Sequence, residues 1–418
     1  MPSEAFRPTL PHRLWRLLPA RSRRRVAGEL AAVFAPRIDR LPPPAHGGVA
    51  VAGELSRISG LGEGARLMLR GLDRLGVASW AIDVAGRLPA GAGGAGAAAA
   101  PPPAGVPLVI HVGAPLLPLL LLRLPRALPR GRRVIGYWNW ELPELPPDWR
   151  AGARFVHEVW VPSAFTAAAV ERLLPGRVRV VPFPLAVAPP RPAALDRAAF
   201  GWPAAAVVVL VSANLASSFE RKNPLAAIAA FRAAFGDRRD RLLVLKLGNP
   251  DHFPADFARV VAAVAAAPNI RIDIKPYPAD VVHALTRAAD IVLSLHRSEG
   301  FGLVLAEAML LGRPVIATGW SGNMAFMDNA SAALVGYRLV APRDPRQVYH
   351  GSRWAEPDHG EAVAQLRRLA EDAAARAALG ARARRQALDR LGAGPLAAAV
   401  RNLGLAVPGE GAEMRLPG

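Results

Sequence analysis

Cysteine is absent from the 418 residues, which excludes disulfide bonds and cysteine-ligated metal centres. The most apolar stretch, residues 106–125, is interrupted by prolines and falls short of the ~20 apolar residues that a membrane span needs. The N-terminal segment lacks an apolar region of the length found in secretory signal peptides. We therefore expect a cytoplasmic protein, and a reducing compartment is compatible with its composition.

Lysine is rare, so arginine supplies nearly all of the 52 basic residues that outnumber 33 acidic ones and give a formal net charge of +19. Arginine is scattered through a chain rich in Ala, Gly and Pro, without the clustered basic and aromatic residues of a nucleic-acid-binding surface. A nucleic-acid-binding protein is therefore the weakest functional alternative. One dense cluster, residues 11–25, fits either a solvated tail or a short amphipathic segment that contacts anionic lipid.

The order of apolar runs predicts two α/β domains. Hydrophobic residues make up 52% of the chain, and short buried-type strands alternate with helical patterns before and after a proline-rich segment at 186–203. This pattern predicts two Rossmann-like, doubly wound domains with a cleft between them, and a helical last hundred residues. The predicted divisions are a basic, proline-rich extension (1–46), an N-terminal domain (47–190), a C-terminal domain (191–390) and a tail (391–418).

The sequence HRSEGFGLVLAEAMLLGRPVIA, from His296 to Ala317, follows an apolar strand pattern at 290–295. The carboxyl ends of parallel strands face the ligand crevice, so Glu299 is expected over the crevice. The helix after it offers a positive dipole end and free N–H groups to a phosphate. Glu307 lies about one turn inside that helix. We expect one carboxylate to bind a sugar and the other a ribose, with diphosphate on the backbone of Gly300, Phe301, Gly302 and Leu303.

This arrangement, with GRPVIA and the Gly-rich GWSGNM after it, resembles the acid-x7-acid signature of retaining glycosyltransferases of the GT-B fold. The relevant family, of the group 1 or family 4 type, includes sucrose-synthase-like enzymes and bacterial mannosyl- and glucosyltransferases. YWNWELPELPPDW, VHEVWVPSAFTAAAV and VRVVPFPL resemble a bacterial subgroup associated with polysaccharide biosynthesis. The resemblance covers residues 47 to 390. It implies transfer of a hexose from a UDP- or GDP-linked sugar to a hydroxyl of a glycan or lipid-linked acceptor.

The resemblance also implies roles for individual residues. Lys222, in FERKNP, matches the family lysine that meets the donor diphosphate. The family arginine five residues upstream is Ser217 here, and Arg221 is expected to substitute for it. Glu299 is expected to contact the donor sugar's hydroxyls and Glu307 to hold the ribose, with the base near the turn at 274–277. No metal or cofactor is expected, and the sequence has no Asp-x-Asp motif.

Further donor contacts are expected from Ser321, Gly322 and Asn323, and from Gly62 in the Gly-rich loop after the first strand. Near Ala325 the family often carries an acid. In the N-terminal domain, a strand-end histidine of the family meets the donor sugar, which makes His111 a catalytic candidate. A second alignment places Gly113 there, and a buried core histidine is the other interpretation.

The stretch YWNWE predicts the acceptor side of the cleft, because tryptophan faces stack on sugars and a carboxylate binds hydroxyls. Trp138, Asn139 and Glu141 are the candidates, and burial in the core is the alternative for the tryptophans. Two functional alternatives remain open: a catalytically degenerate scaffold and a sugar-nucleotide-binding protein. Ser217 and Ala325 are the departures from the family pattern that support them.

Overall fold

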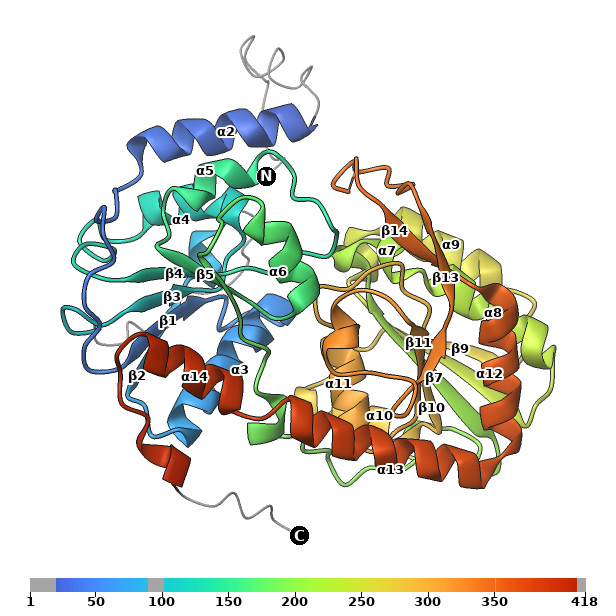
Figure 1. Ribbon diagram of the computed structural model, residues 1–418. Helices are drawn as coiled ribbons and strands as arrows, with labels where there is room; N and C mark the ends of the chain where they lie inside the picture. Colours follow the sequence, from blue (N-terminus) through green and yellow to red (C-terminus); the bar gives the residue numbers. More distant parts are fainter. Residues whose placement is uncertain (1–19, 89–100, 350, 412–418) are drawn as a thin grey trace, which may run out of the picture.

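The computed structural model describes residues 20–88, 101–349 and 351–411 as two α/β domains side by side (Figure 1). The N-terminal sheet has six parallel strands in the order β2-β1-β3-β4-β5-β6. The order reverses between β1 and β3, and this switch point opens a crevice at the carboxyl ends of the strands. The strands are β1 (Val49–Gly53), β2 (Ser79–Asp83), β3 (Leu108–Ile110), β4 (Val134–Tyr137), β5 (Glu158–Val161) and β6 (Val178–Val180).

The C-terminal sheet is also parallel and six-stranded, in the order β12-β11-β10-β7-β8-β9. Its switch point lies between β7 and β10, so the loops that follow these two strands meet at one place. This confirms the predicted two-domain, GT-B class of fold. The strands are β7 (Val207–Asn214), β8 (Arg241–Gly248), β9 (Ile270–Asp273), β10 (Ile291–Ser294), β11 (Val315–Thr318) and β12 (Ala333–Val335).

Helices cover both faces of each sheet, as doubly wound folds require. In the C-terminal domain, α8, α9 and α12 pack on one face of the sheet, while α10 and α11 cover the other. The helices are α2 (Ala20–Phe34), α3 (Gly60–Arg74), α4 (Leu117–Arg123), α5 (Trp149–Ala153), α6 (Ala164–Glu171), α7 (Phe219–Lys222), α8 (Pro224–Phe235), α9 (Pro254–Val264), α10 (Ala279–Ala288), α11 (Leu303–Leu310), α12 (His359–Glu371), α13 (Ala373–Arg390) and α14 (Gly394–Asn402).

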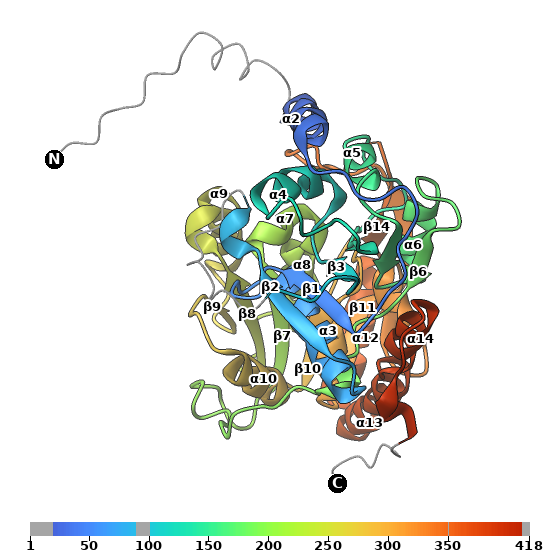
Figure 2. The same ribbon diagram turned by 90° about the vertical axis from the view of Figure 1, so that its left-hand side faces the viewer.

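Within the described ranges, no helix combines the length and the apolar character that a membrane span requires. Three local features differ from the sequence-based description. Helix α2 lies inside the predicted extension and packs on α4 and α5 (Figure 2). Strands β12, β13 (Tyr337–Val340) and β14 (Trp354–Pro357) interrupt the last hundred residues, which were predicted to be helical. Helix α14 lies in the predicted tail, yet it returns to the N-terminal domain and packs on α3.

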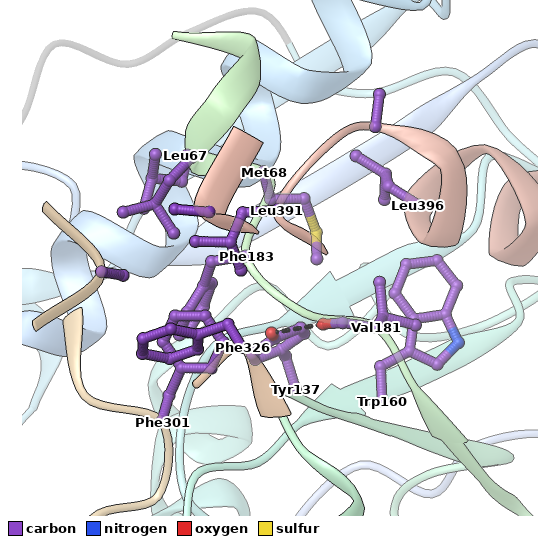
Figure 3. Packing of buried hydrophobic residues seen from close by; sticks show 14 of the residues in the cluster. Leu67, Met68, Tyr137, Trp160, Val181, Phe183, Phe301, Phe326, Leu391 and Leu396 are labelled. Atoms are coloured by element: carbon purple, nitrogen blue, oxygen red, sulfur yellow. Dashed lines mark hydrogen bonds between the residues drawn. The ribbon is translucent and has the colours of Figure 1, made fainter. Parts of the chain in front are cut away.

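The two domains share a hydrophobic core at their boundary (Figure 3). Phe183, just after β6, packs between Tyr137 of the N-terminal sheet and Phe301 of the C-terminal domain, with ring centroids 5.2 and 5.1 Å away. Gly64 of α3 makes this packing possible, because an added Cβ would lie 2.5 Å from the Phe183 ring. The motif phenylalanine is thus a structural anchor between the domains.

The chain crosses between the domains twice, after β6 and after α13. From Ala193 onward, the first crossing already packs on the C-terminal domain, where the Ala193 N–H donates to Asp280 O (2.9 Å). The two crossings are joined to each other, since the Ala186 N–H donates to Leu391 O at 2.9 Å.

Candidate functional site

A lysine–glutamate pair stands where the loops after β7 and β10 meet. Lys222 Nζ lies 2.5 Å from Glu299 Oε1. The side chain of Lys222 is 21% exposed, while that of Glu299 is 10% exposed. The two residues are 77 positions apart in sequence. Their pairing follows from the sheet topology, because a switch point brings adjacent strand ends and their loops together.

Local backbone geometry fixes the position of Lys222. It ends the short helix α7, which lies between Ser218 and Asn223, two non-glycine residues with positive φ (69° and 53°). Such conformations cost about 1–3 kcal/mol each and persist only where surrounding contacts hold them. Asn223 is held by a hydrogen bond from its Nδ2 to Leu295 O (3.0 Å), at the end of β10, and Pro224 then starts α8.

Arg221, the neighbour of Lys222, points into the protein. Its guanidinium donates to the carbonyls of Ser298 (2.7 Å) and Ser217 (2.8 Å) and to the Tyr349 hydroxyl (3.2 Å). It also forms ion pairs with Glu299 (3.2 Å) and Glu141 (3.6 Å), and the residue is 3% exposed. These contacts leave no free face for a diphosphate. The expectation that Arg221 substitutes for the missing family arginine is therefore corrected. Arg221 fixes the loop and the carboxylate of Glu299 from the buried side of the site.

The Glu299 carboxylate is ionised over the whole physiological range. Burial by itself would raise its pKa, but Lys222 and Arg221 outweigh that effect and lower the pKa to about 2. Its backbone is held by the loop after β11: the Glu299 N–H donates to Ser321 Oγ and the Gly322 N–H donates to Glu299 O, both at 2.8 Å. The result is a fixed acceptor for hydroxyl hydrogen bonds.

The predicted donor contacts Ser321, Gly322 and Asn323 are buried in the loop after β11. An added Cβ on Gly322 would lie 2.1 Å from Gly300 O, so only glycine fits there. Asn323 is fully buried, with its Oδ1 3.1 Å from His296 Nε2 and its Nδ2 donating to Thr318 O (3.1 Å). In this structure Ser321 and Gly322 position the backbone of Glu299, and a donor contact of the three residues stays a prediction.

The glycines of the motif allow the backbones of the two domains to pack closely. Gly300 O accepts a hydrogen bond from Ser163 Oγ (2.8 Å) at the N-terminus of α6, across the domain boundary. A Cβ on Gly300 would lie 3.0 Å from Trp140 O. Gly302 takes a positive φ of 97° and caps α11, and Leu303, partly buried, begins that helix. The open N-terminal turn of α11 is the part that faces α3.

Glu307 is the second acid of the motif and lies partly buried between the domains. Burial, and then the neighbouring Glu63 of α3, raise its pKa to about 8, against a smaller opposing effect of Arg70. Glu63 itself is paired with Arg66 (2.8 Å) and Arg70 (2.5 Å). At neutral pH Glu307 therefore carries a proton and can donate a hydrogen bond as well as accept one.

Glu307→Gln tests this protonation state. The folded-state pKa lies above the unfolded value of 4.5, so the native state keeps a proton that the unfolded chain has released. This contribution to stability is fully present below pH 4.5 and is lost as the pH rises through about 8. We expect the variant and the parent to unfold at similar temperatures at pH 5, and the variant to be more stable at pH 9. An equal difference at both pH values would contradict the shifted pKa.

Residues 166–399, more than half of the chain, match the model of the family described as "Family 4 Glycosyltransferase in conflict systems". The chain belongs to this glycosyltransferase family. A D-inositol 3-phosphate glycosyltransferase of Kineococcus radiotolerans is 33% identical over 224 residues, 51% of this chain and 48% of that protein. One from Nocardioides sp. is 29% identical over 225 residues, 51% of this chain and 45% of that protein. The chain thus spans about half the length of the curated relatives it matches.

Solved structures show the same fold for this family-4 member. HepE of Anabaena, solved with UDP and glucose, gives a TM-score of 0.56 at 14% identity and covers 85% of this chain and 99% of that one. A glycosyltransferase from Rickettsia africae gives 0.59 at 12% identity, over 86% of this chain and 98% of that one. At these identities the comparison concerns the fold alone, and it agrees with the two-sheet topology.

The N-terminal domain of this family-4 member places two predicted site residues in the core. His111 is fully buried, stacked on Tyr137 at 4.3 Å with Nε2 3.3 Å from Met68 Sδ, and burial lowers its pKa to about 3. Trp138 is also fully buried, packed edge-on against Trp149. Both predictions are corrected, because both faces of a parallel sheet are covered and a residue near a strand end can still be interior.

Of the other N-terminal candidates, Glu141 lies at the domain boundary, where it also pairs with Arg221. Asn139 and Glu141, at the end of β4, are partly exposed, and Glu141 O accepts a hydrogen bond from Ser298 Oγ. Gly62 lies in the first turn of α3 with its N–H donating to Ser59 Oγ (3.0 Å), and a Cβ there would lie 2.4 Å from Glu54 O. Gly62 therefore permits the tight turn and does not present its amide to a ligand. The roles of Asn139 and Glu141 toward an acceptor stay predictions.

Sequence reasoning missed Tyr349 and Lys246. Tyr349, buried against Trp140 and Trp354, fixes Arg221 but lies in an irregular segment without a pattern. A signal for Lys246 was available. The chain has three lysines among its 52 basic residues, Lys222, Lys246 and Lys275, and they follow or end the adjacent strands β7, β8 and β9. Lys246 Nζ donates to Lys275 O (2.5 Å) and lies 4.9 Å from the Tyr277 ring centroid, so it fixes the turn at 274–277.

Proposed function

We propose that this protein is a retaining, metal-independent hexosyltransferase that uses a UDP- or GDP-linked sugar. The observation that carries the proposal is the Lys222–Glu299 pair at the switch point, with one partly exposed ammonium and one permanently ionised carboxylate. A donor diphosphate would form an ion pair with the Lys222 ammonium, and the sugar hydroxyls would donate hydrogen bonds to the Glu299 carboxylate. The substrate would thus supply an anion to the lysine and hydrogen-bond donors to the glutamate.

In the proposed reaction, the acceptor oxygen forms a bond to the anomeric carbon while the bond from that carbon to the β-phosphate oxygen breaks. Negative charge develops on the leaving phosphate, and Lys222 stabilises it. The phosphate takes the acceptor's proton on the same face of the sugar, which preserves the anomeric configuration. A carboxylate whose pKa is about 2 is a weak nucleophile, which favours a binding role for Glu299 over a covalent one.

The acceptor we propose is a hydroxyl of a glycan or a lipid-linked glycan, in the cytoplasm or at the inner membrane face. Partly exposed Asn139 and Glu141 at the end of β4 are the groups that would bind it. Relatives named for D-inositol 3-phosphate make a small phosphorylated polyol the second acceptor class to assay. The basic cluster at 11–25, which fits either a solvated tail or a segment that contacts anionic lipid, lies outside the described residues up to position 19, and residues 20–25 begin helix α2.

A thermal-shift panel of UDP, GDP, ADP and dTDP, each with and without EDTA, tests the donor. A ligand that binds only the native state adds about 2.7 kcal/mol of stability at a hundred times its Kd. We expect a selective shift with UDP or GDP that EDTA does not change. A shift that EDTA abolishes would overturn metal independence, and no shift with any nucleotide would overturn the transferase assignment.

A sugar-nucleotide-binding protein without transfer is the second candidate, favoured by Ser217 where the family carries an arginine. No arginine side chain takes the place of the family arginine, because the guanidinium of Arg221 is bonded to the Ser217 carbonyl and to Glu299. Release of the nucleoside diphosphate from a radiolabelled donor, with and without acceptor, separates the two functions. Binding without release under all conditions would support the second.

A further inference from the structure

Helix α2 lies on the outside of the N-terminal domain, beyond α4 and α5 (Figures 1 and 2). Its inner face is built from small residues: Gly28 and Ala31 are buried against the neighbouring elements, as is Ala35 directly after the helix. A Cβ on Gly28 would lie 3.9 Å from Pro115 O, so the helix packs closely on the turn before α4. Since this packing uses one face of α2, the opposite face points away from the protein.

That outer face is apolar. Val26, Leu30, Val33 and Phe34 are exposed to 40, 55, 70 and 66%, and they follow one another at the i, i+4, i+7 and i+8 positions of a helix. Residues at this spacing form a single stripe along the helix surface. A continuous stripe of large apolar side chains on an outermost helix indicates an interaction surface, because single exposed hydrophobic residues are scattered on ordinary surfaces.

Unpaired positive charge borders the stripe. Val33 and Phe34 line a shallow hollow of about 570 Å³ together with Arg37, Arg126 and Arg130. These three arginines are exposed, and none of them makes an ion pair or a side-chain hydrogen bond with the rest of the described chain. Asp39 also lines the hollow, but one of its carboxylate oxygens accepts the Gly131 N–H (2.7 Å). The hollow therefore carries a net positive charge beside an apolar ridge.

We propose that this surface docks on an anionic phospholipid bilayer. The stripe of α2 enters the boundary between headgroups and acyl chains, as amphipathic helices with basic flanks do, and Arg37, Arg126 and Arg130 bind lipid phosphates. A second copy of this chain fits the surface poorly, because a two-fold contact would bring the same unpaired arginines together. The surface is separate from the Lys222–Glu299 site, so the inference does not depend on the transfer reaction.

Docking through α2 would also orient the cleft. At the N-terminal end of α2, Arg25 lines a pocket of about 420 Å³ together with Trp140 and Tyr349, which come from the two sides of the domain boundary. Tyr349 contacts Arg221 behind the catalytic pair. The bilayer would thus lie on the side of the molecule where the domain boundary opens next to α2.

Flotation of the full-length chain with lipid vesicles tests the proposal. We expect binding to phosphatidylcholine vesicles that contain phosphatidylglycerol, little binding to phosphatidylcholine alone, and weaker binding at high salt. The double variant Arg126→Glu/Arg130→Glu should partition at least about thirtyfold more weakly, since each arginine near an anionic surface contributes about a factor of five and each new glutamate adds repulsion. Val33→Asp/Phe34→Asp should abolish binding. These variants should keep the parent's melting temperature and nucleotide-induced shift.

Matched controls lie on the C-terminal domain: Arg239→Glu/Arg385→Glu removes two exposed arginines there, and Val261→Asp removes a 43%-exposed valine of α9. Both should bind vesicles like the parent. Deletion of residues 2–19 removes the part of the basic cluster that precedes α2 and leaves the helix itself in place, and binding should persist. The proposal is overturned if binding is lost on that deletion alone, if the controls lose as much as the α2 variants, or if light scattering shows a dimer that Val33→Asp/Phe34→Asp dissociates without any vesicle binding by the parent.

Discussion

Replacing Lys222 by alanine is expected to lower kcat by about 10²–10³-fold, the loss that follows removal of one pre-positioned donor to a developing oxyanion. The reason is that Arg221 is committed to five protein groups, so Lys222 is the cation available to the leaving phosphate. The fold should survive, because Glu299 keeps Arg221 as its partner at 3.2 Å. Steady-state kinetics with the donor identified by the nucleotide panel measures the effect.

Two comparisons sharpen this experiment. Arg239→Ala removes an exposed cation of the same domain and should leave kcat unchanged. Lys222→Arg keeps the charge but changes its shape, so an intermediate rate is expected. If Lys222→Ala keeps full activity at an unchanged melting temperature, the diphosphate does not meet this lysine and the proposed mechanism fails.

Arg221→Ala is expected to lower the free energy of unfolding by about 3–5 kcal/mol, the typical cost of removing one partner from a buried ion pair. The change leaves the Glu299 and Glu141 carboxylates without the guanidinium and the Ser298 carbonyl without its donor. Tyr349→Phe removes one hydrogen bond to Arg221 and should cost about 0.5–1.5 kcal/mol. Equilibrium unfolding in urea measures both.

The adjacent Lys222→Ala is the matched control, because it removes a cation from a partly exposed position on the same short helix. Its stability loss should be well below that of Arg221→Ala. The pH dependence adds a check: Glu299 has a depressed folded-state pKa, so its contribution is present above pH 4.5 and is lost as the pH falls through about 2. If the Arg221→Ala protein keeps the stability of the parent but loses transfer activity, the structural role is contradicted and Arg221 is a ligand of the diphosphate instead.

The position of Glu299 at the crevice could be predicted from the sequence, because alternating strands and helices define parallel sheets and strand ends define the crevice. The family resemblance put Lys222 at the same ligand, but their direct ion pair was not predicted. The sequence could not predict that Arg221 would be buried and Lys222 partly exposed. Successive residues of a helical turn point about 100° apart. Which of two adjacent cations faces the cleft therefore depends on the register of the strained turn between Ser218 and Asn223.

His111 and Trp138 show a second limit. Side chains alternate between the two faces of a strand. In a doubly wound domain helices cover both faces, so this alternation does not tell which polar or aromatic residue reaches solvent. Helix α14 shows a third limit of sequence-based prediction. Its apolar face predicts that the helix packs on another element, but the identity of that element, α3, depends on the path of the chain after α13. Tyr349 lies outside any strand or helix and carried no signal.

The hydrogen bond between Ala186 and Leu391 has a mechanical consequence. Two peptide segments that connect the same two bodies at one place behave as a paired hinge. Bending about their common axis strains the connecting backbone least, whereas twisting or sliding would pull the two segments apart. Phe183 and Phe301 pack beside this axis, so their contact persists through small rotations. The Lys222–Glu299 pair lies entirely within one body, while Glu307 is close enough to Glu63 of the other body to feel its charge. Rotation about the hinge would thus leave Lys222 and Glu299 intact and change the distance from Glu307 to Glu63. In the proposed transferase, this would make nucleotide binding depend on the opening angle of the cleft.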